Sequence, residues 1–219
     1  MSLRQIAFAL FLLIPTFISA QESDSDIQVE LLAEQFPESL GQVCLHFEKE
    51  KSAAFDLPTN RLSNPVGATA RTMVLKTVNK EIPLCTIKLP EKGKAFAIVL
   101  VTAKPSGFSP IIVRKDDAAF NAGDVFFINR SEKTILGKLG GTPLVLKPGE
   151  SKTDRPSKPV DNTYYNIAFA TRESNGEKLI SSTRWPIDNH LRSYLFFFTN
   201  AQGKTTFRAV DEYLEKKAP

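Results

Sequence analysis

Short runs of β-branched and aromatic residues recur along most of the chain about every 8 to 12 residues, and Gly, Pro, Asn or Asp separates them. Helical periodicity is scarce. The pattern therefore predicts an all-β protein of one or two β-sandwich units, with helix confined to a few short turns. The predicted strands are Ile27 to Ala33, Val43 to Phe47, Thr72 to Val78, Cys85 to Leu89, Phe96 to Thr102, Ile111 to Arg114, Val125 to Asn129, Ile135 to Leu139, Leu144 to Lys147, Tyr164 to Ala170, Leu179 to Ser182, Tyr194 to Thr199 and Thr206 to Val210.

Two of these runs, Ala95 to Val101 and Tyr194 to Phe198, are apolar at every position. Successive side chains of a strand point to opposite faces, so both faces of these strands should be covered. We expect them to be central strands. The run from Val43 to Phe47 instead alternates, which predicts one wet face.

The chain divides most readily at 115–121, where charged and small residues separate six predicted strands from seven. This predicts a first sandwich unit over 21–117 and a second over 118–219. A single larger sandwich is the alternative, because sequence does not show whether strands of both halves share a sheet. Within the second half, 147–161 is expected to be a long exposed loop, and Asp211 to Lys217 a helical turn or a frayed tail.

The first 20 residues have the pattern of a secretory signal peptide. Arg4 is followed by an apolar run from Ile6 to Ile14, a break at Pro15 and a small residue, Ala20. Later apolar runs are too short to span a bilayer. We therefore expect an exported chain that is secreted or periplasmic, begins at Gln21 and has no membrane span.

Charge argues against nucleic acid as a partner. Without Arg4 the chain carries 27 lysines and arginines against 24 aspartates and glutamates, a net charge of +3. These charges are scattered in mixed clusters and form no basic run.

The segment 123–151, GDVFFINRSEKTILGKLGGTPLVLKPGES, is the most distinctive part of the chain. Its Gly-Asp turn, its strand ending in Asn and its Pro-Gly-Glu resemble the cupredoxin fold of blue-copper proteins. It also resembles uncharacterised secreted bacterial proteins that carry the same segment. The residues that carry this second resemblance are Phe120, Gly123, Phe127, Asn129, Ser131, Gly137, Leu139, Gly140, Leu146, Pro148 and Gly149. Both resemblances imply an immunoglobulin-like or cupredoxin-like sandwich, and neither implies an activity.

Copper ligands are missing from this frame. A blue-copper site needs two imidazoles and a thiolate, usually with a weak axial thioether. The chain has Thr134, Ile135 and Leu136 where the first His would be expected, and His46 and His190 are its only histidines. The segment is therefore interpreted as a folding element.

Local turn chemistry supports the same interpretation. Gly123 and Gly149 suit turns with positive φ, and Asn129 can close its own turn with an Asx bond. The run Gly137 to Gly141 is expected to contain a hairpin connection.

Cys44 and Cys85 could form a disulfide, as two cysteines of an exported chain commonly do. The strand pattern opposes this, because Cys85 lies on an apolar face while Cys44 lies opposite Val43 and Leu45. Cys44, His46 and Cys85 could alternatively contribute three metal ligands, although their spacing is weak support for such a site.

Trp185, the only tryptophan, is expected in the core, with sugar stacking as the alternative. Arg184 and Arg192 could form an anion patch, although salt bridges to Asp188 are the simpler explanation. His190 is expected to be a solvated turn residue.

No nucleophile elbow or metalloprotease motif occurs in the sequence, so no catalytic, cofactor-binding or metal-binding residue is predicted. Asp116, Asp117, Asp124 and Asp188 are the carboxylates that a hydrolase could use. The favoured hypothesis is a non-catalytic exported sandwich that acts through its surface on an unknown envelope or extracellular protein. The alternative is a small-ligand or metal-binding periplasmic protein of cupredoxin-like shape.

Overall fold

The computed structural model describes residues 27–103, 106–200 and 202–214, and the expected signal peptide lies outside these residues. The all-β prediction is confirmed, because the described chain contains strands and a single 3-10 turn, η2 (Glu38–Leu40). The strands are β1 (Ile27–Ala33), β2 (Val43–His46), β3 (Val66–Ala68), β4 (Thr72–Thr77), β5 (Pro83–Lys88), β6 (Ala95–Thr102), β7 (Phe108–Arg114), β8 (Val125–Asn129), β9 (Ile135–Leu139), β10 (Thr142–Leu146), β11 (Ser151–Asp154), β12 (Tyr164–Glu173), β13 (Gly176–Pro186), β14 (Leu191–Thr199) and β15 (Thr205–Tyr213).

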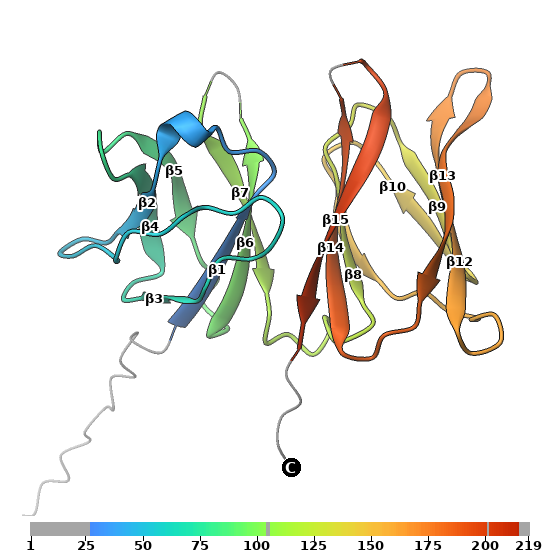
Figure 1. Ribbon diagram of the computed structural model, residues 1–219, viewed down its shortest axis with the longest axis horizontal. Coiled ribbons are helices and arrows are strands. Elements are labelled where there is room, and N and C mark those ends of the chain that lie inside the picture. The colour runs from blue at the N-terminus through green and yellow to red at the C-terminus, as the bar shows by residue number, and fades with distance from the viewer. Residues whose placement is uncertain (1–26, 104–105, 201, 215–219) are drawn as a thin grey trace, which may run out of the picture.

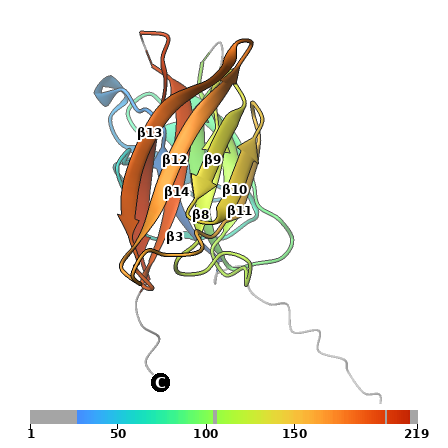
Figure 2. The ribbon, with the colours of Figure 1, turned by 90° about the vertical axis from the view of Figure 1, so that its right-hand side faces the viewer.

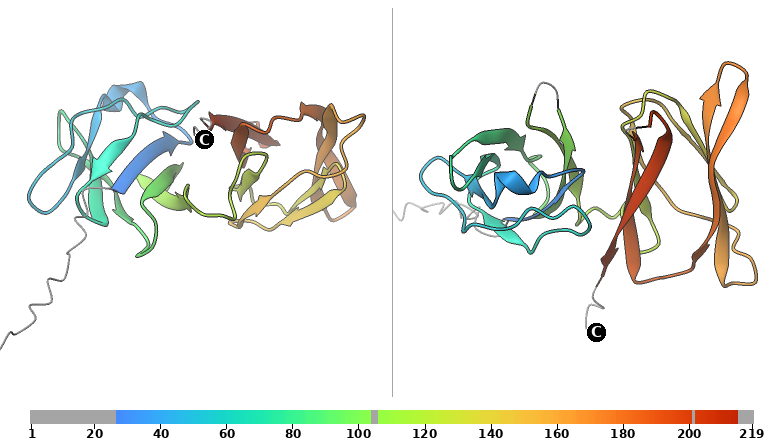
Figure 3. Two further views of the ribbon diagram at one scale, coloured as in Figure 1. Left: turned by 90° about the horizontal axis from the view of Figure 1, so that it is seen from below. Right: turned by 45° about the horizontal axis from the view of Figure 1, so that its top comes forward.

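Four sheets stack in layers (Figure 1). The first half of the chain forms the sheets β2-β4-β5 and β3-β1-β6-β7, and the second half forms β11-β8-β14-β15 and β10-β9-β12-β13. Two further views show the halves side by side (Figure 3). The two middle sheets, β3-β1-β6-β7 and β11-β8-β14-β15, each contain one parallel pair of strands, β1 with β6 and β8 with β14. All other strand pairs are antiparallel.

Three apolar clusters fill the spaces between the four layers. The first core lies between the two sheets of the first half, and the second core between the two sheets of the second half. A junction core lies between β3-β1-β6-β7 and β11-β8-β14-β15. Its buried members are Leu32, Leu62, Ala97, Val99, Val101, Val113, Phe120, Ile128, Tyr194, Phe196 and Val210.

The two wholly apolar strands are central, as predicted. β6 lies between β1 and β7, and β14 lies between β8 and β15. Alternate residues of each strand pack into different clusters. In β6, Phe96, Ile98 and Leu100 pack into the first core, and Ala97, Val99 and Val101 pack into the junction core. In β14, Tyr194 and Phe196 pack into the junction core, and Leu195 and Phe197 pack into the second core. An apolar residue at every position is therefore explained by apolar layers on both faces.

No sheet among the described residues mixes strands from the two halves, and sheet membership changes between Arg114 and Val125. The junction core nevertheless joins the halves through buried side chains. The division at residues 117 and 118 into two separate units stays a prediction.

Two strands escaped the sequence pattern, and the helical turn expected within Asp211 to Lys217 does not form over the described residues of that segment. β3 is a three-residue edge strand, and β11 pairs with β8 inside the expected loop 147–161. Both are held by backbone hydrogen bonds on sheet edges, where no apolar alternation is required. Asp211 to Tyr213 extend β15, because they pair with Leu191 to Ser193 of β14.

Candidate functional site

Asn129 ends β8, and its fully buried side chain holds the following turn. Its Oδ1 accepts hydrogen bonds from the Ser131 backbone N–H at 3.0 Å and from the Ser131 hydroxyl at 2.7 Å. Its Nδ2 donates to the carbonyls of Lys133 at 2.8 Å and Leu146 at 2.9 Å. The expected Asx bond is confirmed, and all four contacts of this side chain are internal.

The rest of the distinctive segment is also structural. Gly123 and Gly149 have φ of 86° and 78°, a region that favours glycine, so the predicted turns are confirmed. Gly140 and Gly141 connect β9 to β10 with Leu139 opposite Thr142, which confirms the hairpin. The inward residues of this segment, Val125, Phe127 and Leu146, are buried in the second core.

The possible disulfide is not formed, because Cys44 and Cys85 are free thiols. β4 lies between their strands, with Cys44 opposite Lys76 and Cys85 opposite Leu75. Two strand spacings amount to about 9.5 Å, which exceeds the Cα separation that a disulfide spans. Neighbouring positions on β4 also face opposite ways, so the opposed faces noted in the sequence were the correct signal. Burial raises the pKa of the Cys85 thiol to about 12.

The same geometry separates the three possible metal ligands. Cys44 and His46 share a face of β2, while Cys85 packs against the first core from the other face. Within the described residues, no group of three His, Cys, Asp or Glu side chains is close enough to hold a metal ion.

The four carboxylates considered for hydrolysis fall into two places. Asp116 and Asp117 follow β7, and each forms a salt bridge of 3.2 Å with Arg114. Asp124 and Asp188 both line a cavity at one end of the second core. Asp124 is already engaged, because its Oδ1 accepts a hydrogen bond from Arg155 Nε at 2.6 Å and its Oδ2 accepts one from the Asn121 N–H at 2.6 Å.

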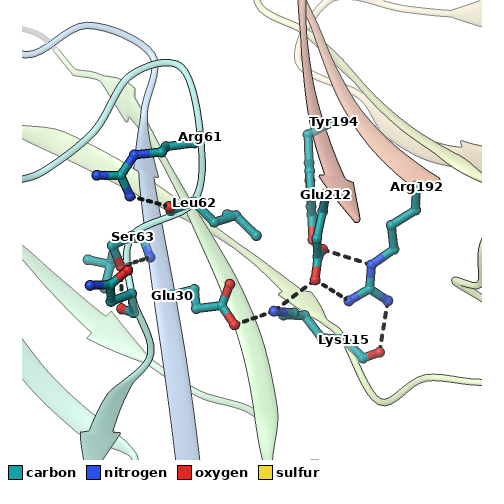
Figure 4. A network of polar contacts seen from close by, with 10 residues as sticks. Glu30, Arg61, Leu62, Ser63, Lys115, Arg192, Tyr194 and Glu212 are labelled. Atoms are coloured by element: carbon teal, nitrogen blue, oxygen red, sulfur yellow. Dashed lines mark hydrogen bonds and ion pairs between the residues drawn. The ribbon is translucent and has the colours of Figure 1, made fainter. Parts of the chain in front are cut away.

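Charged side chains also lie where the two halves meet (Figure 4), with Arg192 buried and its partners mostly buried. Lys115 forms ion pairs with Glu30 of β1 and with Glu212 of β15, the latter at 2.9 Å. Arg192 of β14 pairs with Glu212 at 2.8 Å, and the Tyr194 hydroxyl donates to the same carboxylate at 2.8 Å. The salt bridge expected between Arg192 and Asp188 is therefore wrong. Burial, followed by the negative charge of Glu212, raises the pKa of Tyr194, which keeps this donor protonated.

We call the cavity at the end of the second core the aromatic-acidic cavity. It has a volume of about 230 Å³ and is lined by Gly123, Asp124, Val125, Arg155, Pro156, Tyr165, Trp185, Pro186, Ile187, Asp188, Asn189, Leu191, Ser193, Ala209 and Asp211. Tyr165 and Trp185 are direct partners across β12 and β13, and both half-buried rings pack against the second core. The Trp185 ring lies 5.9 Å from that of Phe169, so the core expectation holds for one part of Trp185, while another part faces the cavity.

The opposite wall of the cavity follows from the register of β14 and β15. Paired residues on the core-facing side run from Phe197 with Phe207, through Leu195 with Ala209, to Ser193 with Asp211. The pair of Phe197 and Phe207 fills the space between the sheets with rings, whereas the pair of Ser193 and Asp211 offers a small hydroxyl and a carboxylate. The space beside Tyr165 and Trp185 is therefore left open.

A second feature lies on the outer face of the sheet β10-β9-β12-β13, which faces the viewer in Figure 2. Val145 is paired with Leu136, Leu136 with Ala170, and Ala170 with Leu179. Paired residues share a face, so these four side chains form a row across all four strands, which we call the outer apolar row. Val145 is 51% exposed and Leu179 is 66% exposed.

The outer apolar row has mainly basic neighbours. Lys138, Arg172 and Arg184 occupy exposed outward positions on β9, β12 and β13, and Glu177 opposite Arg172 is acidic. The Arg184 guanidinium lies 4.9 Å from the centre of the Tyr164 ring. This places Arg184 outside the sandwich rather than beside Asp188.

Sequence reasoning did not find the outer apolar row. The signal was present, because Ile135-Leu136 and Leu144-Val145-Leu146 break the alternation expected of strands with one wet face. The same rule of two apolar faces had identified β6 and β14. The cavity had no such signal, because its walls come from segments up to 88 residues apart, from Gly123 to Asp211.

Comparison with protein-family models finds none that matches this chain, and comparison with curated proteins finds no significantly similar one. Among the described residues, no helix is long and apolar enough to cross a membrane.

Proposed function

We propose that the chain is an exported, non-catalytic β-sandwich protein that binds another envelope or extracellular protein through the outer apolar row. The row itself carries this proposal. Single exposed apolar residues are ordinary on protein surfaces, whereas contiguous apolar patches mark interaction sites. Here the exposed residues Val145 and Leu179 stand at the two ends of one continuous row.

The neighbouring charges define the chemistry of the partner. Three cations, Lys138, Arg172 and Arg184, flank the row, against the single carboxylate of Glu177. A complementary partner has an apolar centre and an acidic rim. Steering by such charges is screened by salt, so association should slow as ionic strength rises.

The four-layer stack favours this role for the outer face. The face of β11-β8-β14-β15 that points away from the second core is covered by the junction core. The outer face of β10-β9-β12-β13 is covered by nothing within the described residues and presents a sheet of four strands (Figure 2). The buried ion pairs of Lys115 and the junction core hold the two halves against each other, so this sheet has a fixed support.

The test compares Leu179→Ser with a matched control, Tyr213→Ser. Tyr213 is 73% exposed on β15, outside the row, and both substitutions should change stability little. Mature protein and both variants are immobilised, incubated with an envelope fraction, and the retained proteins are quantified by mass spectrometry. Affinity for the purified partner is then measured at low and high salt.

We expect Leu179→Ser to weaken binding of the partner by about tenfold, as loss of a large apolar anchor at an interface does. Tyr213→Ser should bind like the parent, and high salt should weaken both. Equal binding by Leu179→Ser, or retention of no protein by the parent, would contradict the proposal.

A further inference from the structure

At one end of the second sandwich, polar residues occupy core-facing positions of β14 and β15. Ser193 and Asp211 occupy the next rung after Leu195 and Ala209, on the same side of β14 and β15. Ser193 is half-buried and Asp211 is exposed, so this end of the row is open to solvent. Here they leave room for the aromatic-acidic cavity, with Trp185 on the opposite wall.

The charges around this cavity do not cancel. Asp124 is neutralised by Arg155, which also donates to the Ala122 carbonyl at 2.7 Å. Asp211 accepts a hydrogen bond from the Ser193 hydroxyl at 2.6 Å, which leaves its charge in place. Asp188 likewise accepts one from the His190 backbone N–H at 2.7 Å.

No cation among the described residues balances these two carboxylates. Neither Asp188 nor Asp211 forms a salt bridge with any residue that the structure describes. The nearby arginines are committed elsewhere, because Arg184 lies over Tyr164 on the outer face and Arg192 pairs with Glu212 at the junction. The cavity therefore combines two aromatic rings with two uncompensated negative charges.

We propose that the aromatic-acidic cavity binds a small organic cation, an alkylammonium group held between the rings of Trp185 and Tyr165 and the carboxylates of Asp188 and Asp211. Aromatic faces attract ammonium groups through the ring quadrupole, and quaternary ammonium ligands are bound in this manner. The volume of about 230 Å³ lies below the roughly 300–1,000 Å³ of drug-sized sites, so one head group suits it. This site is separate from the outer apolar row, and its test does not depend on the proposed function.

The same chemistry has two sources, a free small amine or the lysine side chain of a peptide. Trp185 is the only tryptophan in the chain, so its fluorescence reports on this cavity. The folded mature protein is titrated with choline, with its uncharged carbon analogue 3,3-dimethylbutan-1-ol, and with Nα-acetyl-lysine methylamide at constant ionic strength. Isothermal titration calorimetry provides a second readout.

We expect choline to produce a saturable change that the neutral alcohol does not produce. Asp188→Asn and Asp211→Asn should each lower the affinity for choline by about tenfold. Leu179→Ser on the outer face should leave this affinity unchanged. Tighter binding of choline than of the lysine amide assigns a free amine as the ligand, and the reverse order assigns a lysine side chain.

Equal binding of choline and the alcohol would overturn the proposal, because the cavity would then be merely apolar. Absence of a saturable response to both cations would also overturn it. Unchanged affinity in both folded Asp variants, with folding checked by the denaturant midpoint, would exclude the role given to the carboxylates.

Discussion

Replacing Phe127 by Ala should be among the most destabilising single changes in the second half of the chain. Its side chain is fully buried, and its ring centroid lies 6.1 Å from Phe169 and 6.5 Å from Phe197. Burial of about 150 Å² of aromatic surface, at about 25 cal/mol per Å², gives about 4 kcal/mol. This agrees with the roughly 3 to 5 kcal/mol that Phe→Ala costs in cores.

Urea unfolding followed by Trp185 fluorescence measures this cost, because Trp185 packs on the same core through Phe169. A loss of about 4 kcal/mol lowers the midpoint by roughly 1 to 4 M. The control is Thr134→Ala at a half-exposed position, which should stay within about 0.5 kcal/mol of the parent. An unchanged midpoint for Phe127→Ala would refute the structural interpretation of the distinctive segment.

Three further predictions follow from the junction, the thiols and the leader. Burial alone would raise the pKa of Glu212, but hydrogen bonds from the two neighbouring cations outweigh burial and lower it below 4.5. The ionised Glu212 carboxylate should therefore stabilise the folded protein above pH 4.5, and this stabilisation should be lost as the pH falls through the folded-state pKa. Urea unfolding midpoints measured between pH 3 and 6 should depend less on pH in Glu212→Gln than in the parent. Cys44 and Cys85 should both be alkylated after unreduced unfolding, and Cys85 only slowly in the folded protein, as mass spectrometry can show. We also predict that the chain is exported and that its mature form begins at Gln21; an intact leader in the mass spectrum of secreted protein would contradict this.

The buried charges at the junction connect the stability of the two halves. Lys115 forms ion pairs with Glu30 of the first half and with Glu212 of the second half. Arg192 also donates a hydrogen bond to the Lys115 carbonyl at 2.9 Å. Removing one member of such a group leaves an uncompensated buried charge, which costs more than the intact group contributes. We therefore expect the halves to unfold together rather than separately.

Much of the fold was predictable because strand propensity and side-chain alternation are local properties. β1, β8 and β9 have the predicted bounds, and β6 and β14 are central because an apolar residue at every position requires cover on both faces. The buried turn at Asn129 was also predictable, since its Asx bond reaches only two residues along the chain.

The sequence by itself thus determined most of the segments that form strands, the two central strands that are covered on both faces, and the places of several turns. Only the tertiary structure decided which strands are neighbours and in what register. β4 lies between Cys44 and Cys85, the outer apolar row joins four strands, and Ser193 and Asp211 face Trp185 across a cavity. The physical reason is that a side chain's direction follows from its own strand, whereas its neighbours are set by pairing between distant segments, which local sequence does not encode.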